Sequence, residues 1–214
     1  GKESARFRFD GAGSRSAIDL TELDIRTALG GLNGKLKAQW QPNPDFAFSG
    51  RMQRFDPSYF HPDFPGAIDA DVQLSAASKP DSEWTGLLKI DRLGGSLRGR
   101  ALAGKADLRF RGLAVSGKAE LKAGRSHVVV DGSSGENLDV RAELQPLDLS
   151  DVNPQWSGRI VGDAVLKGDK ARPRYDLDLQ ADALSLLGYQ ARHFAIVGNT
   201  ISGNRTRIAA EGLM

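Results

Sequence analysis

The sequence lacks cysteine, has few aromatic residues and contains no long apolar run. Without cysteine the chain has no disulfide framework, no thiolate metal ligand and no thiol nucleophile. Aromatic residues make up only 7% of the chain, whereas the core of a packed β-sandwich usually recruits more of them. No stretch approaches the roughly 18 consecutive apolar residues of a membrane-spanning helix. The first residues, Gly1-Lys2-Glu3, do not resemble a signal peptide. If the protein is located outside the cytoplasm, we therefore expect the chain to be an internal piece of a longer precursor.

Charged residues are numerous, but the two signs are nearly balanced and interleaved. Lysine and arginine together number 29, aspartate and glutamate 27, and the formal net charge is +2. A protein that binds nucleic acid presents a basic face or stripe, which this distribution does not provide. Nucleic acid is therefore not an expected partner.

A phrase of the sequence occurs twice, at 55–74 and again at 147–166, with an offset of 92 residues and no gap. In each copy an apolar residue and an aspartate lead to a serine, then to a glycine (Gly66 or Gly158), and then to a strand-like stretch of alternating residues. A repeat of this length indicates that one supersecondary unit is stacked upon another.

The dominant period along the chain is two, with apolar residues alternating with polar or charged ones. Such alternation is typical of a strand with one apolar and one charged face. Turn residues separate these stretches at intervals of about 8 to 14 residues, which leaves no room for crossover helices, so neighbouring strands should pair antiparallel. The turns are expected at 11–13, 42–44, 79–81, 94–95, 131–132, 199 and 203–204.

Helical signals are confined to three short segments, at 20–29, 56–61 and 148–153. In the last two, Asp56 and Asp148 are expected to act as N-caps of single helical turns at the edge of the sheet. The glycine that follows each turn would permit a backbone geometry that a side chain forbids.

Residues suited to catalysis or metal binding are scattered. The three histidines, His61, His127 and His193, could form a dispersed metal or acid–base site, or they could be surface or turn residues. Their wide separation in the sequence favours surface or turn residues. The carboxylate pairs 69/71 and 176/178 each share one face of a strand, which is expected to be the solvent face. We therefore expect no catalytic residue, no metal site and no cofactor.

Two basic patterns also have simpler explanations than anion binding. The segment 99–105 has the spacing of a phosphate-binding loop, but Ala106 stands where a serine or threonine belongs, and an alternating strand follows instead of a helix. The arginine pairs 6/8 and 109/111 alternate with apolar residues and are expected to form solvated strand faces.

The apolar face is rich in small and aliphatic residues, as at 70–74 and 162–166. Small residues on the inside of a curled sheet leave space instead of filling it. The predicted fold is therefore all-β, an elongated antiparallel sheet built from repeats, with one apolar face. We expect it to run through 1–214 as a single segment of a longer protein, with internal repeats at about 46–110 and 138–198.

The ordered succession of phrases resembles the TamB family, named for the translocation and assembly module of Gram-negative bacteria. The resemblance covers about 32–208 and is carried by GRMQRFDPSYFHPDFPGAIDADVQLSA, GGSLRGRALAGKADLRFRGLAVSGKAEL, HFAIVGN and the stretch from SHVVVDGSSGENLDV to DLDLQADAL. It implies a periplasmic β-taco, an elongated antiparallel sheet curled over a continuous hydrophobic groove. It also implies that the full-length protein is anchored in the inner membrane and engages TamA, an outer-membrane protein of the Omp85 family. TamB belongs with the AsmA-like and bridge-like lipid transfer proteins, and the family offers no catalytic residue to transfer.

The expected function is a groove that carries or shields phospholipid acyl chains between the inner and outer membranes, in support of outer-membrane lipid homeostasis and protein assembly. The alternative is a scaffold that holds nascent outer-membrane β-barrel proteins by β-augmentation; an enzyme is not expected. The contact with TamA is expected to lie outside this segment. The residues expected to line the groove are Phe46, Phe48, Ile68, Ala70, Val72, Leu74, Leu88, Ile90, Leu108, Phe110, Val115, Leu121, Val128, Val130, Leu138, Val140, Leu144, Ile160, Ala164, Leu166, Leu177, Leu179, Phe194 and Ile196.

Overall fold

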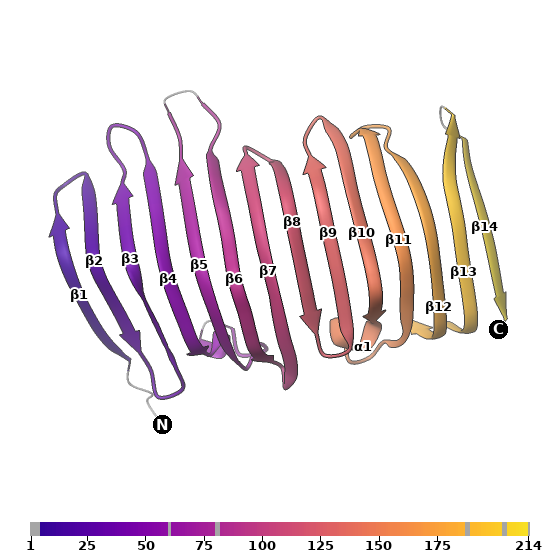
Figure 1. Ribbon diagram of the computed structural model, residues 1–214, viewed down its shortest axis with the longest axis horizontal. Helices are drawn as coiled ribbons and strands as arrows, with labels where there is room; N and C mark the ends of the chain where they lie inside the picture. Colours follow the sequence, from indigo (N-terminus) through magenta and orange to yellow (C-terminus); the bar gives the residue numbers. More distant parts are fainter. Residues whose placement is uncertain (1–4, 60, 80–81, 187–188, 203–204, 214) are drawn as a thin grey trace. The chain divides into compact units, whose positions relative to one another are not determined.

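Strands make up nearly all of the computed structural model, which describes residues 5–59, 61–79, 82–186, 189–202 and 205–213 (Figure 1). The chain divides into two compact units, Gly1–Leu113 and Ala114–Met214. The first unit contains β1 (Arg6–Gly13), β2 (Ala17–Arg26), β3 (Gly31–Gln39), β4 (Asp45–Phe55), the 3₁₀ turn η1 (Pro57–Tyr59), β5 (Gly66–Ala77), β6 (Thr85–Leu97) and β7 (Arg100–Arg111). The second contains β8 (Ala114–Ala123), β9 (Ser126–Ser134), β10 (Asn137–Asp148), α1 (Leu149–Val152), β11 (Ser157–Asp169), β12 (Arg174–Leu186), β13 (Tyr189–Ser202) and β14 (Arg205–Leu213).

Each unit is a single antiparallel sheet in which the strands are hydrogen-bonded in the order of the sequence. Short connections enforce this arrangement. The link between β6 and β7, for example, is Arg98-Gly99, whose φ angles of 52° and 72° match the turn type that suits a two-residue hairpin. The predicted all-β antiparallel fold is confirmed, and neither helical element in the described part of the chain has the length and apolar character needed to cross a bilayer.

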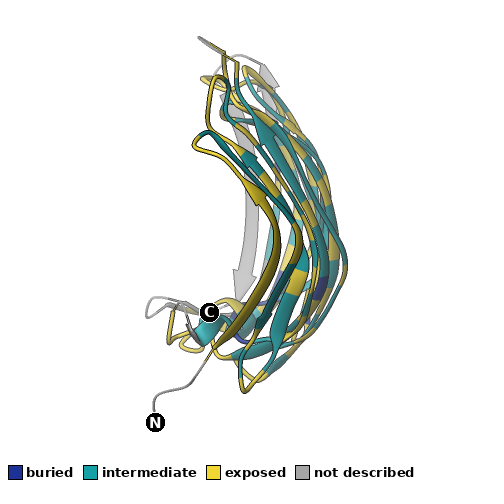
Figure 2. Cartoon of the chain, turned by 90° about the vertical axis from the view of Figure 1, so that its left-hand side faces the viewer, coloured by how far each residue is buried: buried dark blue, intermediate teal, exposed yellow. Residues whose placement is uncertain are grey.

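The strands are bent, so that each sheet has an inner and an outer side (Figure 2). Bulges contribute to the bend, because an extra residue in one strand of a pair kinks that strand. In a regular strand, residues i and i+3 face opposite sides of the sheet. Where a bulge inserts one extra residue between them, the two residues face the same side. The bulges of this kind lie at Leu20/Leu23, Met52/Phe55, Ile90/Leu93 and Leu144/Leu147.

The expectation of a helix at 20–29 is wrong, because most of this segment forms the second half of β2. Its misleading feature is the spacing of Leu20 and Leu23. Three residues separate them because a bulge interrupts the register with β3 at this point, and the same spacing is found on one face of a helix.

Several predicted turns are also wrong, since 11–13, 94–95, 131–132 and Asn199 lie inside β1, β6, β9 and β13. At three of these positions, Gly11, Gly95 and Gly132, the glycine lets the backbone of a neighbouring strand approach closely. A β-carbon on Gly132, whose φ is +136°, would lie 1.9 Å from the carbonyl oxygen of Asp139 on β10. The turn at 42–44 is confirmed between β3 and β4. Residue 79 lies in the β5–β6 connection, whereas 80–81 and 203–204 fall outside the described residues.

A packed core is missing from the described part of the chain. The buried hydrophobic residues there are Ala70, Leu149 and Ala181, and no side chain is fully enclosed. Two packed layers would enclose the facing side chains of both sheets. Each unit therefore consists of one layer whose apolar side chains are only half-buried.

Gly132→Ala should lower the free energy of unfolding by more than about 1 kcal/mol, because the new methyl group would meet the β10 backbone and the φ angle disfavours an L-residue. The matched control is Gly94→Ala, where a β-carbon would meet nothing within 4 Å, and its effect should stay within about 0.5 kcal/mol. Urea unfolding of the two variants tests this difference, and equal effects would contradict the close strand approach at Gly132.

Candidate functional site

Cross-strand pairing arranges the apolar residues of each unit into rows that run from strand to strand. Directly paired residues share a face of the sheet, so each row lies on one side. We call this side the apolar face. In the first unit it contains the rows Leu20-Leu36-Phe48-Leu74-Leu88-Leu108, Ile18-Ala38-Phe46-Ala76-Gly86-Phe110 and Leu23-Gly34-Gly50-Val72-Ile90-Ala106. In the second unit it contains the rows Leu121-Val128-Leu144-Gly162-Leu179-Ile196 and Ala119-Val130-Ala142-Ala164-Leu177-Gly198.

The registers place every residue predicted to line a groove on the apolar face of its own unit. Most of these side chains are half-buried, while Val115 and Leu121 of β8 are exposed. Phe194 lies in β13, but its side chain is outside the described residues. The sheet thus brings the predicted residues together, and their contact with lipid stays a prediction.

The other side of each sheet, which we call the charged face, carries the polar partners of the alternation. Many of its charges are paired across strands, as in Lys37 with Asp19 at 3.0 Å and Arg141 with Asp163 at 3.1 Å. Exposed ion pairs of this kind add little stability. Because these charged side chains lie on the charged face, they do not interrupt the apolar rows on the other side.

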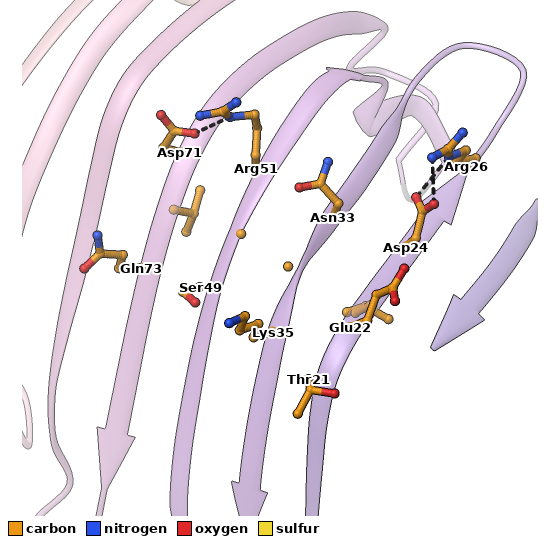
Figure 3. Close-up of a pocket in the computed structure, with 14 residues that line it drawn as sticks. Thr21, Glu22, Asp24, Arg26, Asn33, Lys35, Ser49, Arg51, Asp71 and Gln73 are labelled. Atoms are coloured by element: carbon orange, nitrogen blue, oxygen red, sulfur yellow. Dashed lines mark hydrogen bonds and ion pairs between the residues drawn. The ribbon is translucent and has the colours of Figure 1, made fainter. Parts of the chain in front are cut away.

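A hollow of about 630 Å³ opens in the first unit among residues of β2 to β5 (Figure 3). Most of its labelled side chains belong to the charged face, and two ion pairs border it, Arg26 with Asp24 and Arg51 with Asp71. Acidic and basic groups neutralise each other there. No cluster of three or more histidine or carboxylate side chains that could bind a metal ion occurs among the described residues.

Asp71 and Asp69 are on the charged face, as predicted, yet both have specific partners. A hydrogen bond from Arg51 (2.7 Å) is the largest cause that lowers the pKa of Asp71; desolvation opposes it, and a second arginine, Arg92, lowers the pKa further. Asp69 Oδ1 accepts a hydrogen bond from the backbone N–H of Arg54 (3.0 Å), the residue with φ +48° in the β4 bulge. The sequence pattern did not reveal these partners, because they depend on strand register.

The repeated phrase forms equivalent turns in the two units, at 56–59 with 61–65 and at 148–157, and we call these the capped turns. The predicted N-caps are confirmed. Ser58 N–H donates to Asp56 Oδ1 at 2.9 Å, and at the equivalent position Ser150 N–H donates to Asp148 Oδ1 at 3.1 Å. One helical turn follows each cap, with the N–H of residue 61 or 153 donating to the carbonyl of residue 57 or 149 (3.1 and 3.0 Å). Both aspartates are buried.

The three histidines stay apart. His61 is exposed in a capped turn, whereas His127 is half-buried in β9 and lies 3.1 Å from Glu120. His193 lies 2.7 Å from Asp182. The surface-or-turn expectation is therefore confirmed for His61 and His193, which are exposed, and is wrong for the half-buried His127. His127 and His193 are both strand residues with a carboxylate partner. The segment resembling a phosphate loop is the start of β7, with no helix after it.

Comparison with known proteins gives one family match. Residues 2–210 match the model described as TamB, N-terminal domain. No curated protein and no solved structure matches the chain.

Asp56→Ala should lower the free energy of unfolding by about 1 kcal/mol at neutral pH, because the N–H groups of Ser58 and Gly66 lose their acceptor. The Ser58 amide, more than any other group, lowers the pKa of Asp56 in the fold; desolvation opposes it, and the Ser58 hydroxyl and the Gly66 amide lower the pKa further. The carboxylate's contribution is thus fully present above its ordinary pKa of about 4 and is lost as pH falls through the lower folded value.

Urea unfolding at pH 7 and at successively lower pH checks this sign, since the difference between parent and variant should shrink on acidification. The control is Asp176→Ala on the exposed charged face of β12, which should shift stability by no more than about 0.5 kcal/mol. A difference that is independent of pH would show that the carboxylate charge does not stabilise the turn.

Proposed function

Because the chain belongs to the TamB family, we propose that its apolar face carries or shields phospholipid acyl chains in the periplasm, between the inner and outer membranes. Membership of the family suggests a role in the cell envelope, and the family is not a known enzyme family. The observation that supports the proposal is an apolar face that continues from strand to strand with no second layer over it among the described residues. The full-length protein would be anchored in the inner membrane and engage TamA, with that contact outside this segment.

The energetics of acyl-chain burial fit such a face. Burying one methylene group is worth about 0.8 kcal/mol, so a chain of about 16 carbons gains at most about 13 kcal/mol from a fully covering apolar surface. A half-open face returns only part of this gain, which suits a ligand that must also leave. The sheet satisfies its own backbone N–H and C=O groups, so these do not interrupt the face with unpaired polar atoms.

Charge placement supports the same function. A charge in the path of an acyl chain would cost several kcal/mol unless it were paired. In the first unit, the row from Leu36 through Phe48 and Leu74 to Leu108 contains no polar side chain. An acyl chain could therefore pass between neighbouring strands without meeting a charged group in that row.

A second candidate is a scaffold that holds nascent outer-membrane proteins by β-augmentation. It is supported by exposed apolar side chains on β1, where Phe7 and Phe9 are 62% and 68% exposed. Exposed apolar strand residues provide the side-chain contacts that strand addition needs. Phospholipid in the extract of the purified protein, detected by mass spectrometry, separates the first candidate from this one.

A photo-crosslinking amino acid at Val72 or Leu179 should capture phospholipid in cells, whereas one at Gln73 or Asp178 should not. Adjacent residues in a strand face opposite sides, so a shift of one position moves the probe from the apolar to the charged face. Mass spectrometry of the crosslinked protein provides the readout. Equal labelling of both positions in a pair would rule out the apolar face as the lipid-binding surface.

Val72→Asp should abolish co-purification of phospholipid while the chain stays folded, with a loss of about 1 kcal/mol in urea unfolding. The side chain of Val72 is half-buried on an uncovered face, so the new carboxylate can be hydrated. Gln73→Asp, on the charged face of the same strand, is the control and should leave both readouts unchanged. Global unfolding of Val72→Asp would indicate a packed core, and retention of lipid by a folded Val72→Asp would show that an uninterrupted apolar row is not needed.

A further inference from the structure

The capped turns share more than their aspartate caps, because each ends in an aromatic residue at the equivalent position. Phe64 N–H donates to the carbonyl of His61 at 3.0 Å, and Trp156 N–H donates to the carbonyl of Asn153 at 2.9 Å. Phe64 and Trp156 are separated by the 92 residues of the repeat. The same local backbone thus positions one aromatic ring at the end of β4 and β5 in the first unit, and one at the end of β10 and β11 in the second.

The capped turn of the first unit lies on the side of the apolar face. A β-carbon added to Gly66 would lie 3.4 Å from Pro57 Cδ of η1 and 3.3 Å from Leu97 Cδ1. Gly66 shares its face with Ile68, two residues along β5. The capped turn of the first unit therefore stands at one end of the apolar face. In the second unit the equivalent turn has the same hydrogen bonds and the same place in the repeat, between β10 and β11.

The ring of Phe64 contacts a histidine and an arginine. Phe64 is 38% exposed, and His61 is in edge contact with its ring at a centroid distance of 5.2 Å. On the same ring lies Arg98, whose guanidinium carbon is 4.4 Å from the centroid. Arg98 Nε donates to the carbonyl of Asp63 at 2.8 Å, which holds the guanidinium in place. A phosphate oxygen is a strong acceptor for the remaining N–H groups of such an arginine.

We infer that the capped turns mark the headgroup end of bound phospholipid, with Phe64 and Trp156 in contact with the glycerol–ester region and Arg98 beside the phosphate in the first unit. This inference rests on the proposed function, since it places a lipid whose acyl chains lie on the apolar face. Tryptophan is enriched where hydrocarbon meets water in bilayers, because its ring is apolar and its N–H is polar. At Phe64 the guanidinium of Arg98 supplies the polar group that a phenyl ring lacks. The terminal methyl of an acyl chain would gain nothing from a neighbouring guanidinium, which orients the lipid with its ester end at the turn.

Tryptophan fluorescence tests the orientation directly, because the chain contains only three tryptophans. The double variant Trp40→Phe, Trp84→Phe keeps Trp156 as the single reporter. The matched control, Trp84→Phe with Trp156→Phe, keeps Trp40, which is 47% exposed and follows β3, at the opposite end of β4 from a capped turn. Each variant is loaded with phospholipid brominated either close to the ester or close to the chain terminus.

Bromine close to the ester should quench Trp156 roughly twofold more than bromine at the chain terminus, while Trp40 should not show this preference. A third variant, Phe64→Trp with all native tryptophans changed to phenylalanine, should behave like the Trp156 reporter in the first unit, and adding Arg98→Gln should reduce its quenching. It also serves as the reporter if the Trp156 variant does not fold.

The amount of lipid retained is measured by mass spectrometry on the same samples, which separates two kinds of failure. Retained lipid with no quenching, or with stronger quenching from the chain terminus, overturns the orientation and leaves the proposed function standing. Absence of retained lipid in every variant and in the parent chain overturns both.

Discussion

The rest of this structure depends on one constraint, namely that each side chain must lie on the correct face of its sheet. Side chains alternate at every residue of a strand, so a slip of one position would carry charges onto the apolar face and apolar groups into water. Paired apolar residues stay on one face from strand to strand, as through β3 to β6 in the first unit and β10 to β12 in the second. Where apolar residues stand three apart, as Met52 and Phe55 do, a bulge restores the face. The left-handed φ of Arg54 and the acceptor provided by Asp69 are local consequences of that bulge.

The uncovered apolar face and the nearly absent core are two aspects of the same arrangement. With so few buried side chains among the described residues, the sheets depend on their hydrogen-bond ladders, on cross-strand side-chain contacts and on the capped turns. A second sheet or a layer of helices would complete the burial and close the face. In the function proposed above, the acyl chain would take the place of that second layer, and small side chains such as Ala70 and Ala164 would leave room for it.

Much of the fold follows from features that are local in sequence. Alternation at 106–111 or 138–144 predicts a strand and its apolar side wherever the strand comes to lie, because the period of two belongs to the extended backbone itself. The caps at Asp56 and Asp148 are local as well, since each aspartate binds an amide only two residues away. For the same reason the residues of the apolar face could be named in advance. The helix expected at 20–29 failed because a bulge and a helix both place apolar residues three apart.

The sequence by itself therefore determined the strand content, the antiparallel order and the separation of apolar from charged residues. The tertiary structure decided which glycines are strand residues and not turns, as Gly132 is, because a neighbouring backbone makes the β-carbon impossible there. It also decided which charges meet, as Arg51 and Arg92 meet at Asp71, and on which side of the sheet η1 stands. These features depend on register, a relation between two strands that neither strand encodes by itself, since only pairing across the sheet sets it.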